Sequence, residues 1–260
     1  MTGGTEPLVR LSTCGAIAHI VLSRPAKRNA ITPEMAVALE AAVDRLETDS
    51  RLRVGVLSAD GTAFCAGADL SYVARGHGSA LATPKGGFAG FVRYPRRKPV
   101  IAAVHGHAVG GGFEIMLACD LVVAEHTARF ALPEVTRGVI AGSGLLRLAS
   151  SIPHARSLDI ILTGRTLTAT EATELGLISR LVGPRQAVPA AISLAATIAA
   201  NAPDAVQESL RLAKAAAAGP SAETWELAAE ISRRLRTSAD ALEGASAFLD
   251  RRDAKWTHRQ

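Results

Sequence analysis

The sequence predicts an α/β protein whose first part mixes strands and helices and whose last part is helical. Short apolar runs of strand length recur between helical segments up to about residue 182. From Ala187 onward the chain is rich in alanine and reads as helix. No linker rich in Pro, Gly or Ser separates the parts. We therefore expect a β/α core over residues 1–190 and a C-terminal helical region over residues 191–260.

The composition suits one large domain with a small appendage. The 260 residues are 48 % hydrophobic and only 4 % aromatic, so the core must consist mainly of Ala, Leu, Val and Ile. The 29 Lys and Arg residues outnumber the 24 Asp and Glu residues. This balance favours anionic partners, among which phosphorylated cofactors, nucleic acid and acidic lipid all qualify.

The cysteines and the apolar runs indicate the cellular compartment of the protein. Cys14, Cys65 and Cys119 are far apart and form no CxxC pair, so neither a disulfide framework nor a zinc knuckle is expected. The sequence shows no signal-peptide pattern and no apolar run long enough to span a membrane. We expect a cytoplasmic protein with no membrane partner.

The first elements follow from local patterns. Residues 7–12 and 16–22 read as two strands of a hairpin. Thr32 is positioned to cap a helix, with Pro33 at its first position. Residues 54–59 form an apolar run typical of a buried strand, which leads into a loop of small residues.

The middle of the chain alternates in the same way. Several glycines and weak periodicity over residues 74–90 predict a mobile loop. Four further strands are expected, with a short helix over residues 113–119 and helices beyond Ser143. These strands cover residues 99–104, 121–125, 128–132 and 178–182.

Two strands end in turns of small residues, at 64–70 (FCAGADL) and at 107–120 (HAVGGGFEIMLACD). Small residues let backbone N–H groups approach a ligand closely, and a helix N-terminus favours a developing negative charge. Two such turns side by side would form an oxyanion hole. A dinucleotide-binding turn is the alternative, but GHAVGGG lacks the G-x-G-x-x-G spacing. Close packing of helix on strand is the simplest interpretation.

Two glutamates are the candidate acid and base. Glu114 lies in an apolar helical turn, where a buried carboxylate is costly without a role or a partner. Glu134 follows Pro133 beside apolar neighbours. Carboxylates in low-dielectric surroundings can divide general-acid and general-base duty. The structural alternative makes Glu114 a charge at a helix N-terminus and Glu134 a residue of a surface turn.

Other candidates are given structural interpretations. His105 and His107 lack a third metal ligand nearby, so we expect no metal site. The basic residues Arg93, Arg96, Arg97 and Lys98 have no interleaved aromatic residues, so a solvated face or phosphate steering is favoured over nucleic-acid binding. Cys65 is interpreted as a packing residue.

Several segments together resemble the crotonase (enoyl-CoA hydratase/isomerase) superfamily. They are residues 64–70, PVIAAVHGHAVGGGFEIMLACD and ARFALPEVTRGVIAGSG, with SRPAKRNAI, LTGRTLTATEATELGLI and EGASAFLDRRDAKW. The resemblance covers nearly the whole chain, in order and spacing. It implies a spiral of ββα units with a C-terminal helical trimerisation region, and a homo-trimer or hexamer.

The resemblance also implies an activity. It implies an enoyl-CoA hydratase, a lyase that adds water across the 2,3 double bond of an enoyl-CoA thioester. The backbone amides of Ala68 and Gly111 would form the oxyanion hole. Glu114 would help to activate water for attack at the β-carbon, and Glu134 would deliver or remove the proton at the α-carbon. No cofactor beyond the CoA of the substrate is implied.

The same resemblance assigns a CoA site and leaves the exact reaction open. The residues it implies for CoA are Lys27, Arg28, Ala66, Ala68, Asp69, Leu70 and Arg251. Ala141 and Ser71 depart from the family pattern of proline and lysine, and residues 74–90, which shape the acyl pocket in the family, match nothing recognised. Isomerases and other acyl-CoA enzymes share the scaffold, and a member that only binds CoA or RNA is the non-catalytic alternative.

Overall fold

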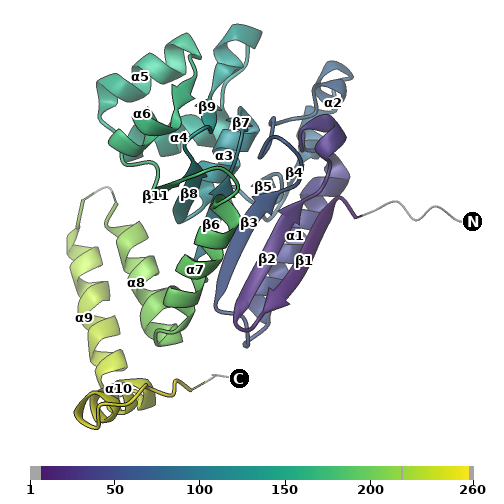
Figure 1. The fold of residues 1–260 in the computed structure, drawn as a ribbon. Helices are drawn as coiled ribbons and strands as arrows, with labels where there is room; N and C mark the ends of the chain where they lie inside the picture. Colours follow the sequence, from purple (N-terminus) through teal and green to yellow (C-terminus); the bar gives the residue numbers. More distant parts are fainter. Residues whose placement is uncertain (1–6, 218, 258–260) are drawn as a thin grey trace, which may run out of the picture.

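The computed structural model describes residues 7–217 and 219–257, and its centre is a six-stranded sheet. Its order is β1-β2-β3-β6-β8-β11. The antiparallel hairpin β1–β2 lies at one edge, and all other neighbours are parallel (Figure 1). The strands are β1 (Val9–Cys14), β2 (Ile17–Leu22), β3 (Val54–Ala59), β6 (Val100–Val104), β8 (Leu121–Glu125) and β11 (Arg180–Val182).

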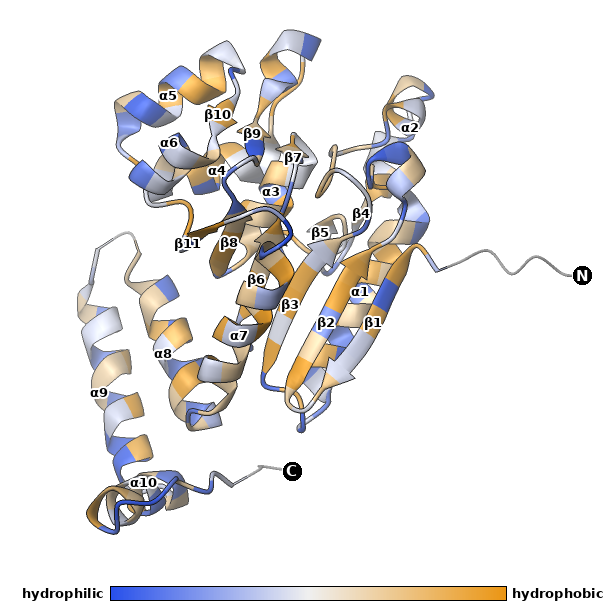
Figure 2. Ribbon diagram, viewed as in Figure 1, coloured by the Kyte–Doolittle hydropathy of each residue, from blue (hydrophilic) through white to orange (hydrophobic). Residues whose placement is uncertain are grey.

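The sheet is covered on both faces, which explains why its central strands are mainly apolar. On one face, helix α7 (Ala187–Ala199) packs Ala191 and Leu194 against Val56 and Val123. On the other face, helices α1 (Pro33–Thr48) and α3 (Gly111–Ala118) belong to the larger core cluster. In Figure 2 the strands β3, β6 and β8 are correspondingly dominated by hydrophobic residues.

Small elements beside the main sheet frame the site. A three-stranded sheet has the order β10-β9-β7, with β7 (His107–Val109), β9 (Arg129–Ala131) and β10 (Leu167–Thr168). The pair β4 (Ala82–Thr83) and β5 (Gly87–Phe88) lies in the segment after α2 (Leu70–Ala74) and the 3₁₀ turn η2 (Gly78–Leu81). The turn η3 (Pro133–Arg137) follows β9 and leads to α4 (Gly142–Ser151). Next come α5 (His154–Thr163) and α6 (Ala169–Glu174).

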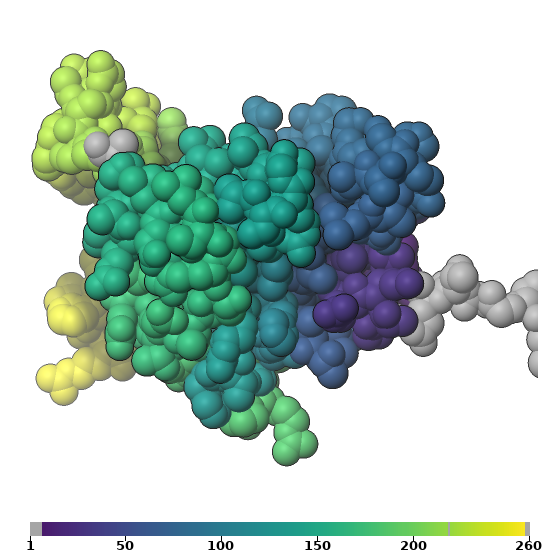
Figure 3. Space-filling view, turned by 90° about the horizontal axis from the view of Figure 1, so that it is seen from above, coloured from purple at the N-terminus to yellow at the C-terminus, as the bar shows by residue number. Residues whose placement is uncertain are grey.

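The last three helices extend away from this body. They are α8 (Pro203–Ala215), α9 (Ala222–Arg236) and α10 (Ala239–Leu249). None of the residues described in α8 is buried, and α9 and α10 bury only Ile231 and Ala247. Figure 3 shows these helices, in yellow-green and yellow, to one side of the molecule.

Most of the expected elements are confirmed, with shifted ends. The strand over 54–59 is found as predicted, and the Thr32 hydroxyl caps α1 by accepting a hydrogen bond from Met35 N. The helix expected over 113–119 begins earlier, at Gly111. The segment 74–90, expected as a loop, contains η2 and the β4–β5 pair. The strands β7 and β10 were not predicted, because two or three residues are too few to show an apolar alternation.

The interpretation of residues 93–98 as one solvated basic face is wrong for two of its members. Arg96 has a side-chain exposure of 4 % and pairs with the equally buried Asp120 at 2.8 Å. Lys98 Nζ donates to Leu46 O at 2.7 Å and to Asp49 O, at the end of α1. These two cations hold elements together, since buried charges need such partners.

No helix in the described part of the chain is long and apolar enough to cross a membrane.

Candidate active site

A cavity of about 280 Å³ lies where the segment 64–70, the start of α3 and η3 meet. Its wall is mainly apolar, with the backbone of small residues on one side and two carboxyl groups on another. The lining comprises Ala66, Ala68, Leu70, Val73, Gly78, Leu81, Phe88, Val109, Gly110, Gly111, Glu114, Pro133, Glu134, Arg137, Val139 and Ile140. The cavity therefore brings together six of the residues proposed from the sequence: Ala66, Ala68, Leu70, Gly111, Glu114 and Glu134.

Backbone hydrogen bonds fix the segment 64–70 beside β7. Cys65 N donates to His107 O at 3.1 Å, and Val109 N donates to Cys65 O at 3.0 Å. The first loop is attached to the other side of this segment, since Ala66 N donates to Arg28 O at 2.9 Å. Three stretches far apart in the sequence thus form one backbone frame.

Two glycines permit the close approach of α3 to this frame. A Cβ on Gly112 would lie 2.0 Å from Cys65 O, and a Cβ on Gly67 would lie 2.8 Å from Gly111 N. Gly67 also has a φ of +87°, a conformation that favours glycine. The glycines of the two turns therefore serve close packing, one of the sequence interpretations, and this packing places the two turns side by side.

Ala68 and Gly111, whose amides are the predicted oxyanion donors, both line the cavity. Gly111 is the first residue of α3, where a backbone N–H has no acceptor inside the helix. The amides on either side of Ala68 donate to Cys65 Sγ and to Ile31 O, whereas no acceptor for Ala68 N occurs among the described residues. Two unused donors at one cavity suit an oxygen that carries negative charge.

Glu114 is buried and its carboxylate is held by the N-terminus of α4. Its Oε2 accepts hydrogen bonds from Ser143 N at 3.0 Å, Ser143 Oγ at 2.6 Å and Gly144 N at 2.9 Å. A Cβ on Gly144 would come within 2.6 Å of Glu114 Cγ, so only glycine allows this approach. All these bonds end on Oε2. The hydrogen bonds to Oε2 therefore fix the orientation of the carboxylate, whereas Oε1 accepts no hydrogen bond from the described residues.

Glu134 has the opposite surroundings. Its Oε2 is buried without a hydrogen-bond partner in the described part of the chain. Its Oε1 lies over Gly110, 3.1 Å from where a Cβ would stand. Burial raises the pKa of Glu134, and the charge of Glu114 raises this pKa further. Hydrogen-bond donors thus hold the carboxyl group of Glu114, whereas the surroundings of Glu134 raise the pKa of its carboxyl group.

The remaining predicted CoA residues lie outside the cavity wall. Asp69 caps α2, and its hydrogen bonds to Ser71 and Arg24 lower its pKa to about 2. Lys27 and Arg28 are exposed in and after the 3₁₀ turn Pro25–Lys27. Arg251 is exposed directly after α10, which Figure 1 places at the opposite end of the molecule from α2. Their roles toward CoA stay predictions.

The sequence analysis missed Ser143 and the apolar part of the wall. Ser143 is 29 residues away from Glu114 and lies in the turn GSG, which carries no sign of its partner. Phe88, Val139 and Ile140 come from segments without a clear period. The one usable signal for Ser143 would have been a helix N-terminus that faces a buried carboxylate, because the free N–H groups there can donate to it.

Two negative expectations concern Cys65 and a metal. Cys65 is fully buried, and burial raises the pKa of its thiol to about 12, as suits a packing residue. Within residues 7–217 and 219–257, no group of three or more His, Cys, Asp or Glu residues is arranged to hold a metal. That the reaction needs no metal stays a prediction.

The chain is similar to known proteins over nearly its full length. The family model of enoyl-CoA hydratase/isomerase matches residues 12–259. Among solved structures, an enoyl-CoA hydratase from Mycobacterium tuberculosis is 40 % identical with a TM-score of 0.92, covering 98 % of this chain and 100 % of the other. A carnitinyl-CoA hydratase from Mycobacterium avium is 38 % identical with a TM-score of 0.78, at the same coverage.

A curated relative adds a second named activity. The carnitinyl-CoA dehydratase of Proteus mirabilis is 36 % identical over 258 residues, covering 96 % of this chain and 98 % of the relative. The two structural relatives match this chain in fold over 98 % of its length. The chain thus belongs to the enoyl-CoA hydratase/isomerase family, within the crotonase superfamily.

Proposed function

We propose that this protein is an enoyl-CoA hydratase, which adds water across the 2,3 double bond of an enoyl-CoA thioester. One observation carries the proposal: Glu114 and Glu134 line the same cavity as Ala68 and Gly111. Two donors for a thioester oxygen and two carboxyl groups in unlike surroundings are what hydration requires.

The two amides act on the thioester carbonyl. Ala68 N and Gly111 N donate to its oxygen, which gains negative charge as water attacks the β-carbon. Such preorganised donors in a site with little water stabilise the enolate-like state by several kcal/mol, about 3 for one donor. The apolar wall then holds the acyl chain beside them.

The two glutamates divide the proton transfers. Glu114, oriented through Oε2, removes a proton from water with its other oxygen, and the water oxygen bonds to the β-carbon. Glu134, whose pKa burial raises, donates a proton to the α-carbon. One proton passes from water to Glu114 and one from Glu134 to carbon, and proton exchange with solvent returns both carboxyl groups to their starting forms, so the sum of one turnover is the addition of H₂O. Run in reverse, the same steps dehydrate a 3-hydroxyacyl-CoA.

Substitution of the glutamates tests this assignment. We expect Glu114→Gln and Glu134→Gln each to lower kcat for crotonyl-CoA hydration by about 10²–10⁴-fold. CoA binding should change little, because neither side chain is assigned to the nucleotide. The double variant should lose less than the product of the single losses, since the two groups act as one unit.

The same kinetics separate the alternatives. An isomerase that uses a single base would tolerate one substitution far better than the other. A protein that only binds CoA or RNA would have no hydratase activity to lose. Two nearly silent substitutions in an active enzyme would show that other residues are catalytic, and melting curves would exclude a folding defect.

The proposal extends to partners. Lys27, Arg28 and Arg251 are assigned to the anionic parts of CoA, and Ala66, Asp69 and Leu70 to the segment around its adenine end. We propose a homo-trimer or hexamer in the cytoplasm, with no cofactor beyond substrate CoA and no nucleic-acid partner. Loss of CoA affinity in Arg251→Gln only in the assembled protein would support a site shared between subunits.

A further inference from the structure

The ring of Phe88 lies against the residue that carries one of the two proposed oxyanion donors. A Cβ on Gly111 would come within 2.3 Å of Phe88 Cε1 and 2.4 Å of Phe88 Cζ, so the ring packs directly on the backbone of Gly111. Phe88 belongs to β5 and lines the same cavity as Glu114 and Glu134. A ring in this place keeps water away from Gly111, and an amide hydrogen bond is stronger where water is excluded.

A glutamate of α1 holds the segment that carries this ring. Glu40 Oε2 accepts a hydrogen bond from Gly86 N at 2.8 Å and another from the hydroxyl of Thr83. These two donors flank the turn between β4 and β5, where Thr83 pairs with Gly87, the residue before Phe88. One carboxylate oxygen of α1 therefore holds both ends of the turn that leads into the ring.

The residues after the ring also rest on α1. Gly90 has a φ of +66°, and a Cβ on it would lie 2.2 Å from Ala36 O. One turn beyond the glutamate along the helix, Asp44 pairs with Lys85 and accepts a hydrogen bond from the Tyr94 hydroxyl. Both sides of the segment are thus attached to α1, and the position of the ring depends on this helix.

We propose that Glu40 is a positioning residue for the reaction. By holding the turn between β4 and β5, it keeps the ring of Phe88 on Gly111 and so keeps water out of the oxyanion hole. Glu40 is not among the described residues that line the cavity, so it acts through the segment it holds. The inference rests on the proposed hydratase function.

Two substitutions of Glu40 test the hold on the turn. We expect Glu40→Ala to lower kcat for crotonyl-CoA by about 10–100-fold, because small displacements beside the reacting atoms are costly. KM should stay within about threefold of the wild-type value, since the loss falls on the transition state. Glu40→Gln keeps a side-chain oxygen that both donors can share, so its kcat should stay within about threefold of the wild type.

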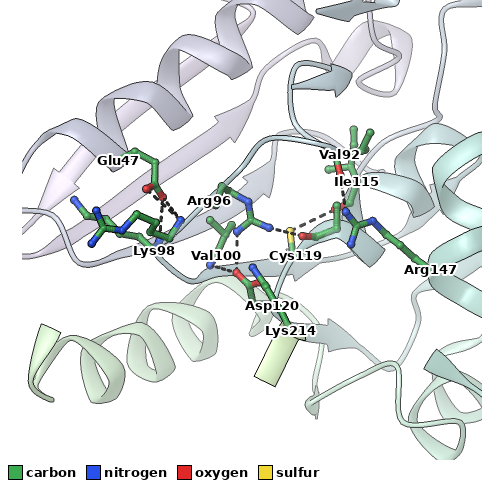
Figure 4. Close-up of polar contacts among 12 residues, drawn as sticks. Glu47, Val92, Arg96, Lys98, Val100, Ile115, Cys119, Asp120, Arg147 and Lys214 are labelled. Atoms are coloured by element: carbon green, nitrogen blue, oxygen red, sulfur yellow. Dashed lines mark hydrogen bonds and ion pairs between the residues drawn. The ribbon is translucent and has the colours of Figure 1, made fainter. Parts of the chain in front are cut away.

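Glu47→Ala is the matched control from the same helix. Glu47 also accepts hydrogen bonds from two backbone amides, Arg97 N at 3.2 Å and Lys98 N at 3.0 Å (Figure 4). It is half-buried like Glu40, and neither of its two partners is among the described residues of the cavity wall. In urea unfolding, Glu47→Ala should destabilise the protein about as much as Glu40→Ala, while its kcat should stay within about twofold of the wild type.

Phe88→Leu tests the route from the helix to the oxyanion hole. If Glu40 acts through the ring, Glu40→Ala should lower kcat by no more than about twofold in the Phe88→Leu protein, because the two losses then share one cause. A full loss in that background overturns the role of the ring.

The remaining outcomes are distinct. Normal kcat in Glu40→Ala, or an equal fall of kcat in Glu47→Ala, overturns the inference and leaves the hydratase proposal standing. If Glu40→Gln loses as much kcat as Glu40→Ala, the hydrogen bonds to the turn are not the cause, and the inference is again overturned. A wild type that does not hydrate crotonyl-CoA overturns the proposed function itself, and the inference falls with it.

Discussion

At the scale of the residue, Glu114 shows how far a sequence can lead. A carboxylate among apolar helical residues had to have a role or a partner, and it is indeed buried and hydrogen bonded. The identity of its donors, Ser143 and Gly144, depends on how α4 packs against α3, which no local pattern encodes. The location of Glu134 on the cavity was likewise beyond the local pattern, since a glutamate after a proline is usually exposed.

The raised pKa of Glu134 predicts a pH effect on stability. Because the folded state binds this proton more tightly than the unfolded state, its contribution to stability is fully present below the ordinary pKa of 4.5. It is lost as the pH rises through the higher folded pKa. We therefore expect Glu134→Gln to be more stable than the wild type at about pH 8, where the wild type buries a charge.

Urea unfolding of both proteins across the pH range measures this. The advantage of Glu134→Gln should shrink as the pH falls toward 4.5. Glu174→Gln changes a glutamate outside the cavity, in α6, and serves as the control. An advantage of Glu134→Gln that is the same at every pH would mean that the carboxyl group keeps its ordinary pKa in the folded protein.

At the scale of the element, the two turns of the site depend on glycines that leave no room for a side chain. The Cβ of Gly112→Ala would lie 2.0 Å from Cys65 O, so α3 or the segment 64–70 must move. We expect a loss of about 1–3 kcal/mol in the free energy of unfolding and a large fall in kcat, since the amide of Gly111 moves with the helix.

Gly183→Ala is the matched control for this variant. Nothing lies within 4 Å of the Cβ it would add, and its φ is outside the positive range. Its unfolding free energy and kcat should stay near those of the wild type. Normal kcat in Gly112→Ala would show that the amide positions do not depend on this contact.

The attachment of α8 gives a second prediction at this scale. Asp120 lies directly before β8 and forms two ion pairs. One is with Arg96 at 2.8 Å, and the other is with Lys214 of α8 at 2.6 Å (Figure 4). Asp120→Asn leaves the buried Arg96 uncompensated, and we expect a loss of about 3–5 kcal/mol in stability. The exposed pair Asp159–Arg165 is the comparison, and Asp159→Asn should cost less than about 1 kcal/mol. Chemical denaturation of both variants measures these losses in stability. Equal losses would show that burial does not make the ion pairs of Asp120 more important than the exposed pair.

Sequence patterns predicted the central strands and the cap of α1 well, because apolar runs and capping residues act locally. They failed for Arg96 and Lys98, which look like a solvated basic run. Their partners, Asp120 and the last carbonyls of α1, are brought near only by the tertiary fold. The strand β7 was missed for the same reason, since three residues become a strand through pairing with β9.

At the scale of the whole molecule, the C-terminal helices end the chain with apolar surface turned outward. Four large side chains of α9 and α10 are 67–84 % exposed: Trp225, Leu242, Phe248 and Leu249. Large apolar side chains gathered at one end of a molecule mark a surface suited to association with another chain. This is the surface through which we propose that copies of the chain associate, by closed symmetry.

We predict a particle of three or six times the chain mass of 27.0 kDa in light scattering coupled to size exclusion. Phe248→Glu should shift the mass toward one chain, because a charge desolvated in an apolar contact opposes association. Leu162→Glu introduces the same change at a residue of α5 that is 67 % exposed in a different region, and it should leave the mass unchanged.

A wild type of one chain mass at micromolar concentration would refute the assembly. If Phe248→Glu stays assembled while Leu162→Glu dissociates, the contact lies on the side of α5 instead. Since Arg251 follows α10 directly, loss of assembly should also weaken CoA binding if that arginine serves a neighbouring subunit.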